Sequence, residues 1–135
     1  MKRTILSLTL LAGLVLAAVP VVAHHSFSAE FDNTKQKTVK GFVTKVDWAN
    51  PHVWIYLNVK DEKGVTANWG FEMGPPHLLQ AQANPWKRDT VKIGDEIEVN
   101  GSLAKNGSKK LNARAVTFVK TGLRVGAASS EGVTP

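Results

Sequence analysis

Cysteine is absent from this chain of 135 residues. Its absence excludes disulfide bonds, thiolate metal ligands, thiol catalysis and a lipid anchor on cysteine. Beyond the apolar stretch near the start, no apolar run is long enough to cross a bilayer. The sequence also lacks a Gly-x-Ser-x-Gly elbow, a glycine-rich phosphate loop and a paired-histidine zinc helix. We therefore expect a binding protein rather than an enzyme, with metal-dependent oxidation as the remaining catalytic alternative.

The chain has little acidic charge, with 17 Lys and Arg against 11 Asp and Glu and a formal net charge of +6. The basic excess is scattered along the sequence. Its densest group, Lys105, Lys109 and Lys110, flanks a Gly-Ser pair and is typical of a solvated turn. We expect no nucleic-acid partner.

Residues 1–23 have the composition of a secretory signal peptide. Lys2 and Arg3 precede an apolar segment from Ile5 to Val19, and small residues follow at Val21-Val22-Ala23. Cleavage after Ala23 leaves His24 as the first residue of a periplasmic or secreted protein. We expect no membrane association after cleavage.

Alternating apolar residues predict an all-β domain over residues 37–120. Its five expected strands and one short helix occur in the order of a small OB-like barrel, with a small open sandwich as the competing architecture. Residues 24–36 are expected to form an N-terminal arm and residues 121–135 a flexible tail. The strands are expected at Val39–Trp48, His52–Val59, Val65–Met73, around Ile97–Leu103 and at Leu111–Val119, with the helix at His77–Ala83.

The second and third strands have a specific expected register. A loop of Glu62, Lys63 and Gly64 places Gly64 in the left-handed conformation that such hairpins need. The apolar side chains of both strands then share one face, and Trp54 lies opposite Glu72 on the other. His52 is diagonal to Glu72, within reach of a long side chain.

Several short motifs are spread over most of the chain after residue 23. They are His24-His25-Ser26-Phe27, Val43-Thr44-Lys45-Val46, Asn50-Pro51-His52-Val53-Trp54-Ile55-Tyr56, Asn68-Trp69, Phe71-Glu72-Met73-Gly74, Gly94-Asp95 and Asn112-Ala113-Arg114-Ala115-Val116. Together these motifs resemble a family of small exported bacterial proteins catalogued as a domain of unknown function. The resemblance implies export, a single small β-rich domain and no established activity. The positions of interest that it carries over are His24, His25, His52, Trp54, Trp69, Glu72 and Arg88.

A first hypothesis is a metal site at His24. A terminal histidine offers an α-amine and an imidazole, and a further imidazole from His25 or His52 completes a nitrogen set that suits copper. Glu72 is the candidate supporting ligand, or the acceptor that orients an imidazole. Zinc is the alternative metal. The arrangement is similar to the terminal-histidine copper sites of lytic polysaccharide monooxygenases, although the similarity covers His24 alone.

The second hypothesis is a metal-free module that binds a small ligand or a protein partner through an aromatic sheet face. Its candidate residues are Trp54, Tyr56, Trp69 and Arg88, and a sugar, a peptide or a small aromatic molecule suits such a surface. Purely structural roles compete with both hypotheses. His52 can hydrogen-bond Glu72 within the fold, and the tryptophans can serve as packing.

Overall fold

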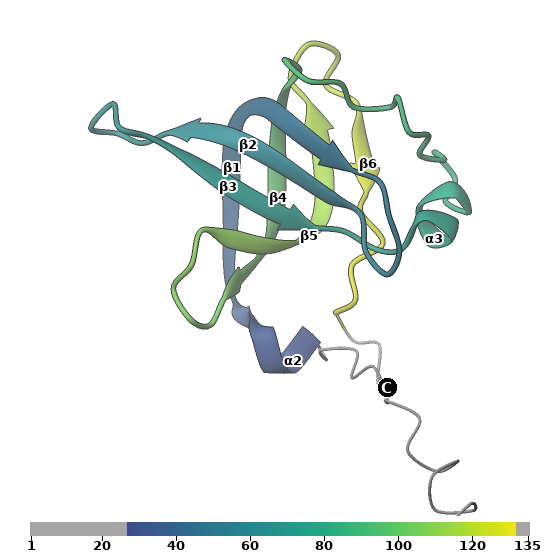
Figure 1. The fold of residues 1–135 in the computed structure, drawn as a ribbon, viewed down its shortest axis with the longest axis horizontal. Helices are drawn as coiled ribbons and strands as arrows, with labels where there is room; N and C mark the ends of the chain where they lie inside the picture. Colours follow the sequence, from purple (N-terminus) through teal and green to yellow (C-terminus); the bar gives the residue numbers. More distant parts are fainter. Residues whose placement is uncertain (1–26, 132–135) are drawn as a thin grey trace, which may run out of the picture.

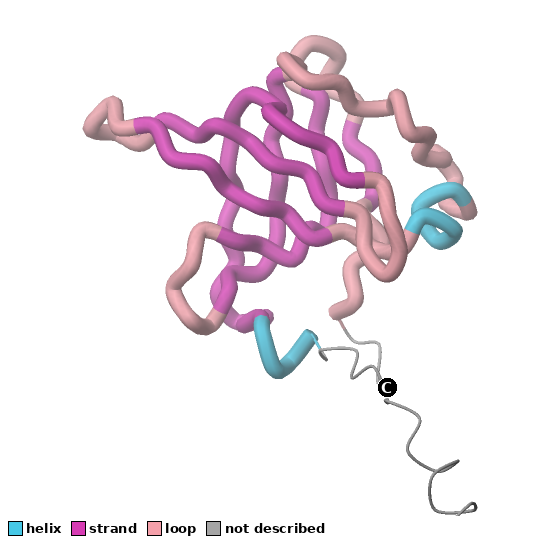
Figure 2. Tube along the Cα trace, viewed as in Figure 1, coloured by secondary structure: helices cyan, strands magenta, loops and turns pink. Residues whose placement is uncertain are grey.

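A computed structural model describes residues 27–131 of the chain. Six strands form one sheet in the order β3-β2-β1-β4-β5-β6, and β3 also pairs with β5, so a ring of hydrogen bonds encloses the core (Figure 1). The all-β, barrel-like prediction is confirmed. Figure 2 shows how little of the described chain is helical. The elements are α2 (Phe27–Glu30), β1 (Phe31–Asp47), β2 (Trp54–Lys60), β3 (Thr66–Glu72), α3 (Pro76–Gln80), β4 (Glu96–Ala104), β5 (Lys110–Phe118) and β6 (Arg124–Gly126).

The β2–β3 hairpin has the register that the sequence predicted. Trp54 pairs with Glu72 and Leu57 pairs with Trp69. Gly64 has a φ of +82°, and the amide of Asp61 donates to the carbonyl of Val65 across the loop. The alternation of apolar side chains therefore determined the pairing here, because any shift by one residue would expose the buried face.

Strand β1 is long because two neighbours share it. Residues from Phe31 to Phe42 pair with β4, and residues from Phe42 to Asp47 pair with β2. Gly41 lies where the pairing passes from one neighbour to the other, and a Cβ there would lie 2.3 Å from the carbonyl oxygen of Asn58. The close approach of two backbones requires glycine at this bend.

The core fills the interior of the ring with aliphatic side chains from every long strand. Trp86, from the loop between α3 and β4, is buried in this core and donates from Nε1 to the carbonyl of Gly126 at 2.7 Å. The largest fully buried side chains are those of Trp86, Phe71, Ile55, Leu57, Met73, Leu79, Ile97 and Leu111.

The chain ends depart from the expected boundaries. Strand β1 begins at Phe31, inside the expected arm, and the preceding residues form α2, a second short helix. A sixth strand, β6, pairs with β5 inside the expected flexible tail. Val125 and Ala127 are buried there, which explains the order of this segment despite its small, polar composition. Among the helices of residues 27–131, none has the length and apolarity needed to span a membrane.

We expect Gly41→Ala to lower the free energy of unfolding by about 1–3 kcal/mol, because the added methyl group meets the backbone of β2. Urea denaturation measures the change. Lys40→Ala, an exposed neighbour on the same strand whose ion pair with Glu96 is solvated, is the control and should stay within about 0.5 kcal/mol of wild type. Equal effects of the two substitutions would show that the bend tolerates a side chain.

Candidate functional site

Glu72 is the central side chain of the candidate site. It ends β3, where β3 runs parallel to β5 and Glu72 pairs with Asn112. Its residue exposure is 8%, which is unusual for a carboxylate. The Asn112 amide donates from Nδ2 to Oε1 of Glu72 at 3.4 Å. The closure of the ring thus places a carboxylate in a poorly solvated position beside a fixed amide.

His52 contacts the same carboxylate from the loop between β1 and β2. The pairing of β2 with β3 continues past the strand end, because Met73 donates to the carbonyl of Val53 at 2.8 Å. This pairing brings Nδ1 of His52 to 3.0 Å from the carbonyl oxygen of Met73 and 3.2 Å from Oε1 of Glu72. Both neighbours are acceptors, so Nδ1 carries the proton, and in the neutral ring Nε2 keeps its lone pair.

Helix α2 brings a second carboxylate to this end of the barrel-like sheet (Figure 1). Glu30 lies 3.9 Å from the ammonium of Lys110, and that ammonium lies over the ring of Trp54, 5.7 Å from its centroid. The rings of Phe27 and Phe31 are stacked with centroids 5.8 Å apart. The start of the described chain is therefore anchored near Glu72 rather than on a distant face.

The environment of Glu72 raises its pKa above the ordinary value for glutamate. Burial is the largest cause, because it disfavours the charged carboxylate, and the negative charge of Glu30 adds to it. His52, the Asn112 amide and Lys110 act in the opposite direction. Glu72 is consequently held by partners that offset only part of its desolvation.

The segment after β6 completes the surroundings of Asn112. Ser129 donates to Oδ1 of Asn112 at 2.6 Å, and the Asn112 amide donates to Ser130 at 3.0 Å. Glu131 forms an ion pair with Arg114. Reasoning from the sequence missed this network, because it treated the segment as a loose tail. Its sequence signal is the Asn112-Ala113-Arg114 stretch, to which no role was assigned.

The four residues expected to bind a ligand do not form one group. Trp54 and Tyr56 are stacked on the outer face of β2 with ring centroids 6.2 Å apart. Trp69 lies on the opposite face, where it packs against the core beneath the ammonium of Lys37. Arg88 is in the loop between α3 and β4, beside Trp48 and Trp86. The structure thus brings together only Trp54 and Tyr56.

The expected metal ligands are brought together in part. His52 and Glu72 are in contact, as their diagonal register predicted. His24 and His25 lie outside the described residues. Within residues 27–131, no three metal-ligating side chains of His, Cys, Asp or Glu gather in one cluster. His52 and Glu72 alone are too few donors for a metal ion, so a metal site here needs donors from the chain ahead of α2.

The sequence pattern of a family of unknown function, DUF6152, matches residues 12–113. The chain belongs to this family. The matched residues include the His24-His25 pair and the whole β2–β3 hairpin. They also include Glu72 and Asn112, which pair with one another in the candidate site. No curated protein and no solved structure matches the chain. The family assigns no activity, and the function has to be argued from the site.

We expect Glu72→Gln to change the pH dependence of stability. A pKa raised in the folded state means that folding stability is lost as the pH rises through that pKa. Glutamine stays neutral and keeps an acceptor for Asn112. The stability of the variant relative to wild type should therefore increase from about pH 4 to about pH 7, measured by urea denaturation with a chelator present.

Glu62→Gln, in the exposed loop of the β2–β3 hairpin, is the matched control for removal of one carboxylate. If the free energy of unfolding of Glu72→Gln differed from that of wild type by the same amount at every pH, this would contradict the effect of burial on the pKa of Glu72.

Proposed function

We propose that the protein is exported and binds a metal ion, with copper favoured over zinc, through His24 and His52. The observation that carries the proposal is the orientation of His52. Its Nδ1 faces the Met73 carbonyl at 3.0 Å and Glu72 at 3.2 Å. A histidine whose one nitrogen donates to a carboxylate or carbonyl presents the other to a metal, and such a partner also makes the ligand more basic.

The position of α2 supports the role of His24. Phe27, the first described residue, is three residues after His24, and an extended chain of that length reaches about 11 Å. Helix α2 lies beside Lys110 and Glu72, as the Glu30–Lys110 ion pair and the effect of Glu30 on the pKa of Glu72 indicate. The short tether from α2, which lies at the same carboxylate that His52 contacts, supports the proposal that His24 can reach His52.

The donor set favours copper. A free α-amine and an imidazole on His24, with the imidazole of His52, make three nitrogen donors, and Cu(II) prefers nitrogen ligands in a tetragonal arrangement. His25 is the alternative source of the second imidazole. Glu72 is the acceptor that orients His52 through Oε1, which also accepts from the Asn112 amide, and its second oxygen is a candidate supporting ligand.

We expect Cu(II) to stabilise the chain that begins at His24 by about 2.7 kcal/mol at a hundredfold excess over the dissociation constant. Adding one residue ahead of His24 converts the α-amine into an amide and should remove most of this gain. His52→Ala should remove part of it. Thermal unfolding with and without Cu(II) measures each change, and mass spectrometry of the exported protein establishes its first residue.

His77→Ala is the control, because His77 is an exposed histidine on α3 and lies outside the proposed site. Equal stabilisation of the chain that begins at His24 and of its extended form would show that the amine is not a ligand. An exported protein that starts at another residue would also contradict the proposal.

A further inference from the structure

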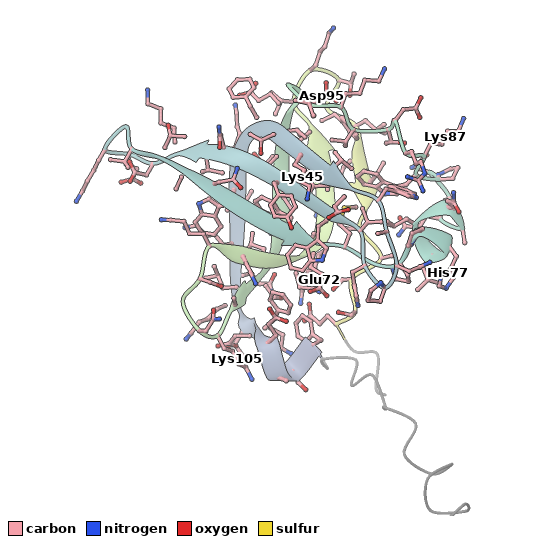
Figure 3. The ribbon with its side chains drawn as sticks, in the orientation of Figure 1. Lys45, Glu72, His77, Lys87, Asp95 and Lys105 are labelled. Carbon is pink, nitrogen blue, oxygen red and sulfur yellow. The ribbon has the colours of Figure 1, made fainter. Side chains whose placement is uncertain are left out.

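The outer face of the hairpin carries a row of four residues from four strands. Lys45 of β1 pairs with Tyr56 of β2, Tyr56 pairs with Gly70 of β3, and Gly70 pairs with Lys110 of β5. Trp54 lies beside this row on the same face. We call these five residues the aromatic platform. The face that carries Lys45 and Glu72 is turned toward the viewer in Figure 3.

Gly70 allows both rings to lie over β3. A Cβ at Gly70 would be 3.3 Å from Cε1 of Tyr56 and 3.5 Å from Cζ3 of Trp54. The two ring planes are only 21° apart, and their centroids are 6.2 Å apart, close to a two-residue step along a strand. The two rings therefore lie over Gly70 and form one apolar surface.

A lysine lies at each end of the platform. The ammonium of Lys45 is 5.4 Å from the Tyr56 centroid, and that of Lys110 is 5.7 Å from the Trp54 centroid. Asp47 and Glu30 hold these two lysines at 3.2 Å and 3.9 Å. The side chains of Lys45 and Lys110 remain 62% and 45% exposed, so both ammonium groups are accessible to a ligand.

We propose that the aromatic platform binds a saccharide chain that carries carboxylates on some of its units. The apolar face of a sugar ring stacks on Trp54 and Tyr56, and a carboxylate on the chain reaches Lys45 or Lys110. Three strand spacings separate β1 from β5, about 14 Å, which exceeds a single sugar ring. This site goes beyond the proposed metal function and does not depend on it.

The local charge favours such a saccharide over a nucleic acid. Single-stranded nucleic acids also stack on aromatic side chains, but they need a cationic groove for one phosphate per nucleotide. Here Asp47 and Glu30 balance the two lysines, and Glu72 lies beside Trp54. That balance repels a dense polyanion and tolerates a chain with spaced carboxylates. OB-type barrels bind both oligonucleotides and oligosaccharides on the face of strands 2 and 3, so the local charge is what separates the two ligand classes here.

The proposal is tested with the chain that begins at His24, in a buffer that contains a chelator. Binding is followed by tryptophan fluorescence and by calorimetry. The probe is a hyaluronan oligosaccharide, in which carboxylate-bearing and neutral sugars alternate. We expect it to bind more tightly than a neutral N-acetylglucosamine oligomer and than oligothymidylate. Trp54→Ala should weaken binding about tenfold or more. The double variant Lys45→Met and Lys110→Met should weaken binding of hyaluronan and leave the neutral oligomer unaffected.

Matched controls separate binding from folding. Phe42→Ala removes an exposed aromatic ring of β1, and Lys60→Met removes an exposed lysine of β2; both should leave binding unchanged. Trp54→Phe keeps a ring and should restore part of the affinity. His24→Ala should leave binding intact, which separates this site from the metal proposal. Tighter binding of oligothymidylate, no hyaluronan binding, or unchanged affinity in Trp54→Ala would overturn the proposal.

Discussion

Three residues of β3 pair in parallel with three residues of β5, and this short contact turns an open sheet into a ring. Without it, β3 would be an exposed edge with unpaired backbone groups. The same contact places Glu72 beside Asn112 and Gly70 beside Lys110. The buried carboxylate and the outer aromatic platform therefore both depend on one pairing between segments forty residues apart.

The burial of Glu72 is unfavourable for a charged group, and four parts of the chain contribute to its support. His52 comes from the loop before β2, and Asn112 from β5. The segment after β6 fixes Asn112 through Ser129 and Ser130, and Glu30 of α2 forms an ion pair with Lys110 of β5, whose positive charge favours the charged form of Glu72. A buried polar group with partners from so many elements fixes their relative positions, because each lost partner would leave a desolvated atom unpaired.

Local sequence patterns predicted what depends on neighbouring residues. The β2–β3 register, the turn at Gly64 and the His52–Glu72 contact followed from alternation and turn chemistry. The parallel β3–β5 pairing could not be predicted in this way, since alternation shows which face of a strand is buried but not which strand is its partner.

The same limit explains why Trp69 and Arg88 do not join Trp54 and Tyr56 in one group. Their residue types suit binding, yet one packs against the core and the other lies in a separate loop. Strand β6 was missed because Val125 and Ala127 form too short an apolar pattern.

Glu72 of β3 lies between the residues of the two proposed sites. Glu72 experiences the charges of both His52 and Lys110, and Lys110 lies over Trp54 at the edge of the platform. If both proposals hold, a cation at His52 would add positive charge beside Glu72 and would favour a saccharide carboxylate at Lys110. Coupling between two binding equilibria is reciprocal, so the saccharide favours the cation by the same factor. Each proposed site has its own ligating side chains, so either can exist without the other, and if both are occupied they would influence one another only through the charges around Glu72.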